Sequence, residues 1–151
     1  MSYILPAITL YQPWATWIIR GWKTIETRTH NRFACLTHKT ILIHAGLTTD
    51  ASAANNPYLS KGQLIYQPEE MVNGFILGSA YVDATGLLCG DQYENKAALI
   101  NTADRYGLFL QKIEKFDQPI PAKGEMGIWY YDLENKQKVS KPKPNALTLF
   151  S

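Results

Sequence analysis

The chain has 151 residues, of which 46% are hydrophobic, and a formal net charge of +2. This length and apolar content suffice for one domain with a buried core. No apolar run reaches the roughly 18 residues that indicate a membrane-spanning helix, and the N-terminus lacks the pattern of a secretory signal. Cys35 and Cys89 form no Cys-x-x-Cys pair, which fits a reducing compartment. We therefore expect a cytoplasmic protein.

The basic side chains are unevenly distributed along the sequence. Residues 1–40 contain five basic side chains and one acidic one, residues 41–134 contain six and twelve, and residues 135–151 contain four lysines and no acid. Residues 1–134 together are thus slightly acidic, with eleven basic and thirteen acidic side chains. Non-specific binding of duplex DNA needs many phosphate contacts, so this distribution favours a local basic pocket over a broad basic surface.

In chain order, Ile4 to Tyr11 predicts a first strand, and Pro6 places that strand at an edge or near a bulge. A short apolar helix begins at Pro13, because proline is favoured in the first helical turn. Gly21 ends this helix, since glycine readily takes the left-handed conformation. From Thr24 to Thr29, β-branched and charged residues alternate, which predicts a strand.

The predicted strand carries charged side chains at regular spacing. Alternation places Glu26 and Arg28 on one face and Thr27 on the other, and Lys23 in the preceding turn can lean over the face of Glu26. We expect the ammonium, carboxylate and guanidinium groups to converge on a hollow beside the helix that carries Trp14. The alternative is a surface strand with solvated charges.

Two blocks of the sequence carry a recognisable signature. The first combines the apolar helix with Gln12-Pro13-Trp14-Ala15 and Gly21-x-Lys23-x-x-Glu26-x-Arg28. The second is Pro119-Ile120-Pro121-Ala122-Lys123-Gly124-x-x-Gly127-Ile128-Trp129. Together they resemble the ASCH domains, a branch of the PUA-like superfamily, over most of residues 4–133. The resemblance implies an α+β fold, namely a small mixed β-barrel of the PUA-like/ASCH type with two or three flanking helices.

The remainder of the first 134 residues predicts further strands and helices. The helices are Thr49–Ala54 and Asn95–Asp104. The strands are Thr40–His44, a bulged Phe75–Leu88, Tyr106–Phe116 and Gly127–Leu133. Pro119 and Pro121 are expected to break the ladder between the last two strands. Trp129 is expected in the core.

A histidine, a cysteine and a second histidine lie close together at His30, Cys35 and His38. A zinc site needs a fourth ligand at suitable spacing, which this segment lacks. A polar loop with a buried thiol is therefore favoured, and we expect neither a metal nor a cofactor.

The C-terminal segment differs in composition from the rest, so we expect a domain at residues 1–134 and a basic flexible tail at residues 135–151. Glu134 to Pro144 is polar, basic and proline-bearing, as in disordered linkers. The end of the chain resembles the peptides that bind bacterial sliding clamps, through Leu147, Leu149 and Phe150, but lacks their initial glutamine. The alternative is that these side chains fold back on the domain as an extra strand.

The first functional hypothesis is a binding module for RNA, single-stranded nucleic acid or a modified nucleoside, as the family resemblance implies. Lysine and arginine side chains would meet phosphate, an aromatic ring would stack on a base, and an amide would read a base edge. His44 could act as a neutral hydrogen-bond partner in the pocket, or be purely structural. The expected ligand-binding residues are Gln12, Trp14, Arg28, His44 and Lys123.

The alternative is a small hydrolase, because some ASCH relatives resemble amidohydrolases for N(4)-acetylcytidine or ribonucleases. Lys23 and Glu26 would then be catalytic, with Lys23 as base or oxyanion donor and Glu26 carrying the second proton. The deacetylase-type relatives carry threonine where this chain has Glu26, and Thr27 is expected on the wrong face to replace that hydroxyl. Asp83 is the candidate for a third carboxylate. A third hypothesis, a protein-interaction subunit, rests on the tail alone.

Overall fold

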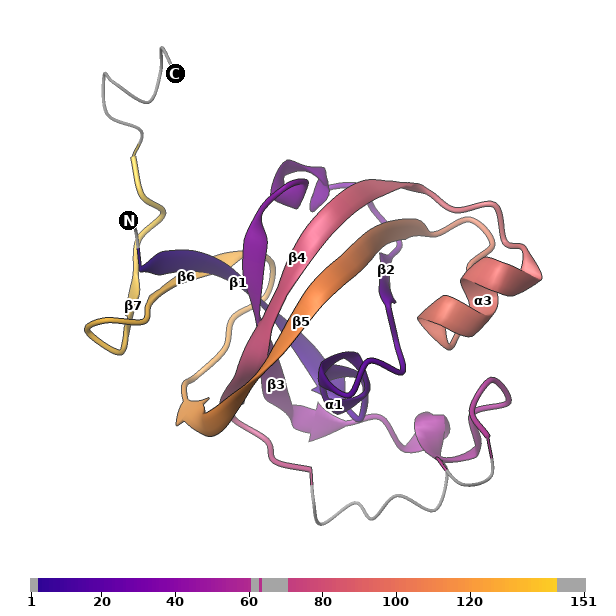
Figure 1. Cartoon of the computed structure of the whole chain (residues 1–151), viewed down its shortest axis with the longest axis horizontal. Coiled ribbons are helices and arrows are strands. Elements are labelled where there is room, and N and C mark those ends of the chain that lie inside the picture. The colour runs from indigo at the N-terminus through magenta and orange to yellow at the C-terminus, as the bar shows by residue number, and fades with distance from the viewer. Residues whose placement is uncertain (1–2, 61–62, 64–70, 144–151) are drawn as a thin grey trace.

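The computed structural model describes residues 3–60, 63 and 71–143 (Figure 1). Within these residues lie two α-helices, two 3-10 helices and seven strands. In chain order they are β1 Ile4–Gln12, α1 Trp14–Ile19, β2 Ile25–Arg28, η1 Ala34–Leu36, β3 Thr40–Thr49, η2 Ala51–Asn55, β4 Phe75–Leu87, α3 Gln92–Ala98, β5 Tyr106–Pro121, β6 Trp129–Asp132 and β7 Gln137–Val139.

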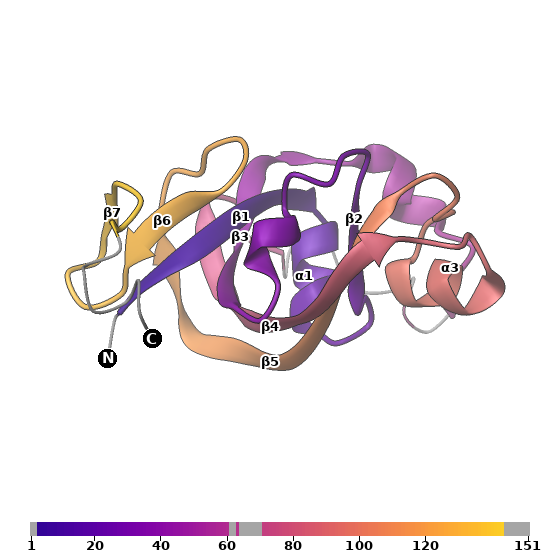
Figure 2. The ribbon, with the colours of Figure 1, turned by 90° about the horizontal axis from the view of Figure 1, so that it is seen from above.

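All seven strands belong to one mixed sheet in the order β2-β5-β4-β3-β1-β6-β7. β1 and β3 are parallel, and the other pairs are antiparallel. The fold is therefore α+β, as predicted. Among the described residues no pairing joins β2 to β7, and the two strands lie at opposite ends of the curved sheet (Figure 2). Closure into a barrel is thus not confirmed.

The sheet curves around α1, which lies inside the bend (Figure 2). Ala15 and Ile18 of α1 are fully buried and pack with apolar side chains of β1, β3, β4 and β5. Trp129 is only 3% exposed and belongs to a second cluster with Tyr131, so its predicted core position is confirmed. In the part of the chain that is described, no helix is long and apolar enough to cross a membrane.

Several predicted boundaries are wrong. β3 continues past its predicted end at His44 to Thr49, and the helix predicted at Thr49–Ala54 is a 3-10 helix at Ala51–Asn55. The helix predicted at Asn95–Asp104 lies earlier, because Asp91 caps its start and Leu99 ends it in the left-handed conformation, at φ 58°. β5 continues through Pro119 and Pro121. This end of β5 is an edge of the sheet, since β2 pairs only with the first four residues of β5. Proline is tolerated at an edge because its missing N–H can face the open side.

The predicted linker is ordered in part. Gln137–Val139 forms β7 and pairs with β6, so the expectation of disorder over residues 134–144 is wrong for these three residues. A short backbone ladder holds them where composition alone indicated no structure. The proposed sliding-clamp residues Leu147, Leu149 and Phe150 lie outside the described residues, and the division at residue 134 stays a prediction.

Gly78 in β4 marks a close approach of two strands. A Cβ atom added there would lie 2.1 Å from the Glu114 carbonyl oxygen of β5. We expect Gly78→Ala to lower the free energy of unfolding by about 1–3 kcal/mol or more, because the clash is with backbone. Gly86→Ala in the same strand is the control, since a Cβ atom there meets nothing within 4 Å. Urea unfolding of both variants checks this, and equal stability would contradict it.

Candidate functional site

A cavity of about 1230 Å³ opens between α1, the ends of β1, β2 and β3, and the loop that joins β5 to β6. Most of the predicted site residues lie in its wall, namely Trp14, Lys23, Glu26, Arg28, His44 and Lys123. The first four belong to the first sequence motif, His44 lies in β3 and Lys123 belongs to the second motif. The fold therefore brings two motifs that lie far apart in the sequence to one cavity.

Lys23 is the most unusual member of the wall, because its side chain is only 2% exposed. Its ammonium donates a hydrogen bond to the carbonyl of Ala98, the last residue of α3, over 2.5 Å. The end of a helix carries unpaired carbonyls and a partial negative charge. The ammonium also lies 3.6 Å from Oε1 of Glu26 and 5.2 Å from the centre of the Trp14 ring, so three elements surround it.

Glu26 and Arg28 extend this arrangement along β2. Oε2 of Glu26 lies 3.3 Å from Nη2 of Arg28, so the carboxylate is shared between an ammonium and a guanidinium. The Arg28 guanidinium stacks 5.0 Å from the centre of the Phe33 ring. Its Nε is buried and has no hydrogen-bond partner among the described residues. Arg28 therefore has hydrogen-bonding capacity that the surrounding protein does not use.

Burial lowers the pKa of the Lys23 ammonium below its usual 10.5, and the Glu26 carboxylate partly opposes this shift. The nearby Arg105 and Arg28 guanidinium groups lower it further. A lysine in such surroundings gives up its proton more readily than a solvated lysine. The arrangement can thus stabilise negative charge or take part in proton transfer.

Trp14 is fixed by a residue that the sequence analysis did not select. Its Nε1 donates to Oδ2 of Asp50 over 3.0 Å, and Asp50 also accepts from the backbone and the hydroxyl of Ser52. Hydrogen bonds from Ser52 and Trp14 lower the pKa of the Asp50 carboxyl group. Asp50 lies in the cavity wall and holds the indole in one orientation.

Gln12 does not line the cavity, so its predicted contact with a base edge is corrected. Its side chain is fully buried and both ends of its amide are occupied. Oε1 accepts from the Thr16 backbone N–H of α1 over 3.0 Å, and Nε2 donates to the Val72 carbonyl over 2.8 Å. Gln12 therefore caps the helix start and positions Trp14.

His44 lines the cavity, but both ring nitrogens are occupied within the protein. Nε2 lies 2.7 Å from the Ala122 carbonyl, which can only accept, so Nε2 carries the proton. Nδ1 then accepts from the Thr9 hydroxyl over 3.2 Å, and that hydroxyl accepts from Nε1 of Trp129 over 3.0 Å. These contacts support the structural alternative for His44, which joins β1, β3 and β6, and its ligand-binding role stays a prediction.

Three cations of the wall are in no ion pair within the described part of the chain: Arg32, Arg105 and Lys123. Arg32 and Lys123 are exposed. The acidic side chains of the wall are engaged, since Glu125 pairs with Lys138 at 2.8 Å, and Glu26 and Asp50 have the partners described above. The excess charge that the cavity offers to a ligand is therefore positive.

Arg105 and Thr27 also lie in the cavity wall, although the sequence indicates no site role for Arg105 and places Thr27 on the opposite face. Arg105 donates from Nε to the Thr27 hydroxyl over 2.8 Å, and both line the cavity. Thr27 was expected on the opposite face, but the cavity extends past the edge strand β2 and both faces contribute. Arg105 lies here because β5 pairs with β2, a long-range pairing for which the sequence holds no local signal. Asp83, the candidate third carboxylate, is exposed in β4 and does not line the cavity.

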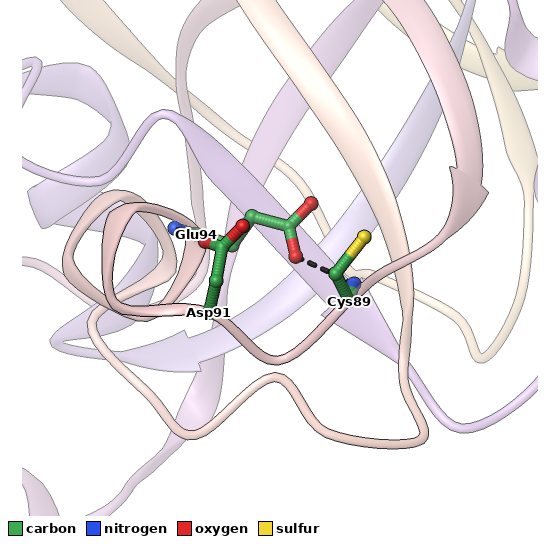
Figure 3. Close-up of side chains that lie close together, drawn as sticks. All are labelled: Cys89, Asp91 and Glu94. Atoms are coloured by element: carbon green, nitrogen blue, oxygen red, sulfur yellow. Dashed lines mark hydrogen bonds between the residues drawn. The ribbon is translucent and has the colours of Figure 1, made fainter.

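One group of described residues has metal-ligating atoms in proximity: Cys89, Asp91 and Glu94, within 4.8 Å of one another (Figure 3). Glu94 accepts from the Cys89 backbone N–H over 2.6 Å, and Asp91 accepts from the Glu94 backbone N–H over 2.8 Å. Asp91 thus caps the start of α3, and Glu94 also accepts from the Gly90 backbone N–H over 3.1 Å, so the cluster is explained by hydrogen bonds at the start of this helix. In the earlier histidine–cysteine segment, Cys35 is exposed, so the expected buried thiol is corrected.

A scan against protein-family models and a search of curated proteins found no match. Among solved structures, the chain is similar to the crystal structure of ASCH from Zymomonas mobilis, with 18% identity, a TM-score of 0.49, and coverage of 77% of this chain and 72% of that one. Two mutants of the same protein match with TM-scores of 0.44 and with 17% and 18% identity. The residue roles below are therefore assigned from the geometry of this chain alone.

The buried His44 predicts a pH dependence of stability. Burial lowers the pKa of His44 below its usual 6.5, so between the two values the unfolded chain binds a proton that the folded chain does not. The free energy of unfolding should therefore fall as pH decreases below about 6.5. Urea unfolding between pH 7.5 and 5 checks this, with His44→Gln as the comparison. Identical slopes for both proteins, or an NMR titration of His44 at or above 6.5, would contradict it.

Proposed function

We propose that the cavity binds a nucleotide of single-stranded RNA or a modified nucleoside. The observation that carries this proposal is a large concave site whose wall combines cations outside any described ion pair with aromatic rings and a buried carboxylate–guanidinium pair. A nucleotide offers a matching set of groups, namely a phosphate, a flat ring and a hydrogen-bonding edge.

The phosphate would meet Lys123, Arg32 or Arg105. Arg32 and Lys123 are exposed at the cavity, so a bound phosphate need not displace an existing ion pair. The guanidinium groups match phosphate oxygens in a two-pronged geometry, and the Lys123 ammonium acts as a point charge.

The base would bind deeper in the cavity. Trp14 and Phe33 supply aromatic surface, and the Arg28 guanidinium offers a plane on which bases stack. The Glu26 carboxylate accepts hydrogen bonds from an exocyclic amino group, and Arg28 donates to a ring carbonyl. Because these groups are held by Lys23 and Phe33, they are preorganised to discriminate one base edge from another.

Single strands are favoured over duplex because of shape and charge. An unpaired base can enter a concave site, whereas a base in a duplex must first leave its stack. Residues 1–134 have no net excess of basic side chains, so extended duplex contacts lack the charge that they require. The 2′-hydroxyl is what distinguishes RNA from DNA at such a site.

Lys123 provides a test of the phosphate contact. We expect the wild-type protein to bind a labelled hexaribonucleotide, and Lys123→Ala to reduce the slope of log Kobs against log salt concentration by about 0.7, the value of one phosphate contact on a single strand. Fluorescence anisotropy at four salt concentrations measures both slopes. Lys115→Ala is the control, because this exposed lysine lies in β5 and outside the cavity wall. Equal slopes for the two variants would contradict the contact.

A second function, hydrolysis, is favoured by one observation. The Lys23 ammonium, whose pKa is lowered by burial, lies 3.6 Å from a carboxylate oxygen in the wall of the same cavity. Such a pair can exchange a proton with a bound substrate. Since Glu26 stands where the deacetylase-type relatives carry threonine, the nucleophile would be a water molecule that Glu26 activates.

An assay for reaction products distinguishes hydrolysis from binding alone. If hydrolysis occurs, the wild-type protein should release acetate from N(4)-acetylcytidine or cleave a short RNA. Glu26→Gln should then lower the rate by about 100-fold or more, the usual size of a general acid–base contribution. Chromatography of the products, with the melting temperature of each variant as a folding control, measures this. Nucleotide-induced stabilisation without product would assign the cavity to binding alone.

A further inference from the structure

Three large apolar side chains are exposed around the mouth of the cavity. Tyr11 is 57% exposed, Leu47 83% and Met126 fully exposed, and all three line the cavity. Single exposed apolar side chains are normal, but several that gather beside polar groups mark an interaction site. The depth of the cavity therefore carries buried charged groups, whereas its mouth carries exposed apolar side chains.

Tyr11 and Leu47 lie at an irregularity in the pairing of β1 with β3. Leu10 pairs with Ala45 and Gln12 with Thr49, so Tyr11 alone lies opposite the three residues 46–48. An irregularity of this kind re-aims side chains at the end of a strand pair. Leu47 lies near Gly74, where an added Cβ atom would be 3.4 Å from Cδ2 of Leu47. One end of the Leu47 side chain thus lies over Gly74, and the rest is exposed at the mouth.

Met126 reaches the rim from a different part of the chain. It lies in the loop between β5 and β6, next to Gly127 with φ 75°. The same loop holds Lys123 and approaches β1 and β3 closely at Gly124, where a Cβ atom would lie 2.4 Å from the Thr9 hydroxyl and 2.6 Å from Nδ1 of His44. Apolar surface and an exposed ammonium therefore share one loop at the mouth.

The volume of the cavity indicates the size of its ligand. Pockets that bury a drug-sized ligand have about 300–1,000 Å³, whereas this cavity has about 1230 Å³. A single nucleotide held by the deep carboxylate and guanidinium would leave the mouth unused. An extended ligand would cover both regions.

We propose that the mouth is a stacking subsite for the base next to the one in the cavity, so the ligand is a single-stranded oligonucleotide rather than a free nucleotide. This inference rests on the function proposed above. Tyr11 stacks on the neighbouring base, Leu47 and Met126 flank it, and Lys123 meets the phosphate between the two nucleotides. Aromatic stacking with adjacent cations is the usual way in which proteins hold single strands.

The test is a length series of ribonucleotides with one, two, three and six units, which compete with the labelled hexamer. We expect at least about a tenfold gain in affinity from the mononucleotide to the trinucleotide. Tyr11→Ala should weaken trinucleotide binding by about 5- to 100-fold, the range for loss of one stacked base, and leave mononucleotide binding unchanged. Tyr11→Phe should retain the affinity, because the ring remains.

Tyr3→Ala is the matched control, since Tyr3 is 52% exposed and does not line the cavity. Equal affinity for all lengths, with no effect of Tyr11→Ala, would overturn the subsite and leave the nucleotide pocket intact. Failure of every length to bind would overturn the proposed function and the subsite with it. A dimer in sedimentation that dissociates on Leu47→Ser would assign the rim to a second copy of the chain and overturn the oligonucleotide proposal.

Discussion

The burial of the Lys23 ammonium is the constraint on which the arrangement of the site depends. Taking an ion of this size out of water costs several kcal/mol even after the protein relaxes, so the charge must be compensated at close range. The Ala98 carbonyl, the Glu26 carboxylate and the Trp14 ring provide this compensation. They belong to α3, β2 and α1, so a single charge fixes the relative positions of three elements.

The same requirement explains the preorganisation of the cavity. Glu26 is held by two cations, Trp14 by Asp50, and Asp50 by its contacts with Ser52. Glu26, Trp14 and Asp50 thus each have at least one partner before any ligand arrives, whereas Nε of Arg28 has none among the described residues. In the same wall, by contrast, Arg32 and Lys123 are exposed, and Lys123 shares its loop with the exposed Met126. Under the proposed function, groups in the depth of the cavity would distinguish one base from another. Cations and aromatic rings at its mouth would supply affinity that does not depend on the sequence.

The sequence held enough information for the local elements of the site. Proline at a helix start, glycine after its end and a change from helical to alternating periodicity predicted α1 and β2 nearly to the residue. Position in the sequence also predicted that Lys23, Glu26 and Arg28 would converge. The partners Ala98, Asp50 and Arg105 were not predictable, because they depend on where α3 docks and on how β5 pairs with β2.

Side-chain roles were harder to predict than positions. Gln12 and His44 have the residue types of ligand-binding groups, and His44 even lines the cavity. Their hydrogen-bonding capacity is nevertheless used by the helix start and by the Thr9–Trp129 pair. A residue type defines which bonds can form, but only the surrounding fold determines which of them are still available. The ladder at Gln137–Val139 was missed for a related reason, since a short strand added at an edge has no compositional signal.

The bond between Lys23 and Ala98 spans 75 positions of the chain, and this has a consequence for biosynthesis. Since the chain is synthesised from its N-terminus and a domain generally folds as a unit, the motif helix and its strand emerge from the ribosome well before the carbonyl that receives the ammonium. Until that carbonyl is available, the Lys23 ammonium stays hydrated. The buried charge cluster around Lys23 would therefore form only once most of the polypeptide has been translated, so a truncated product would carry the motif residues without the assembled cavity.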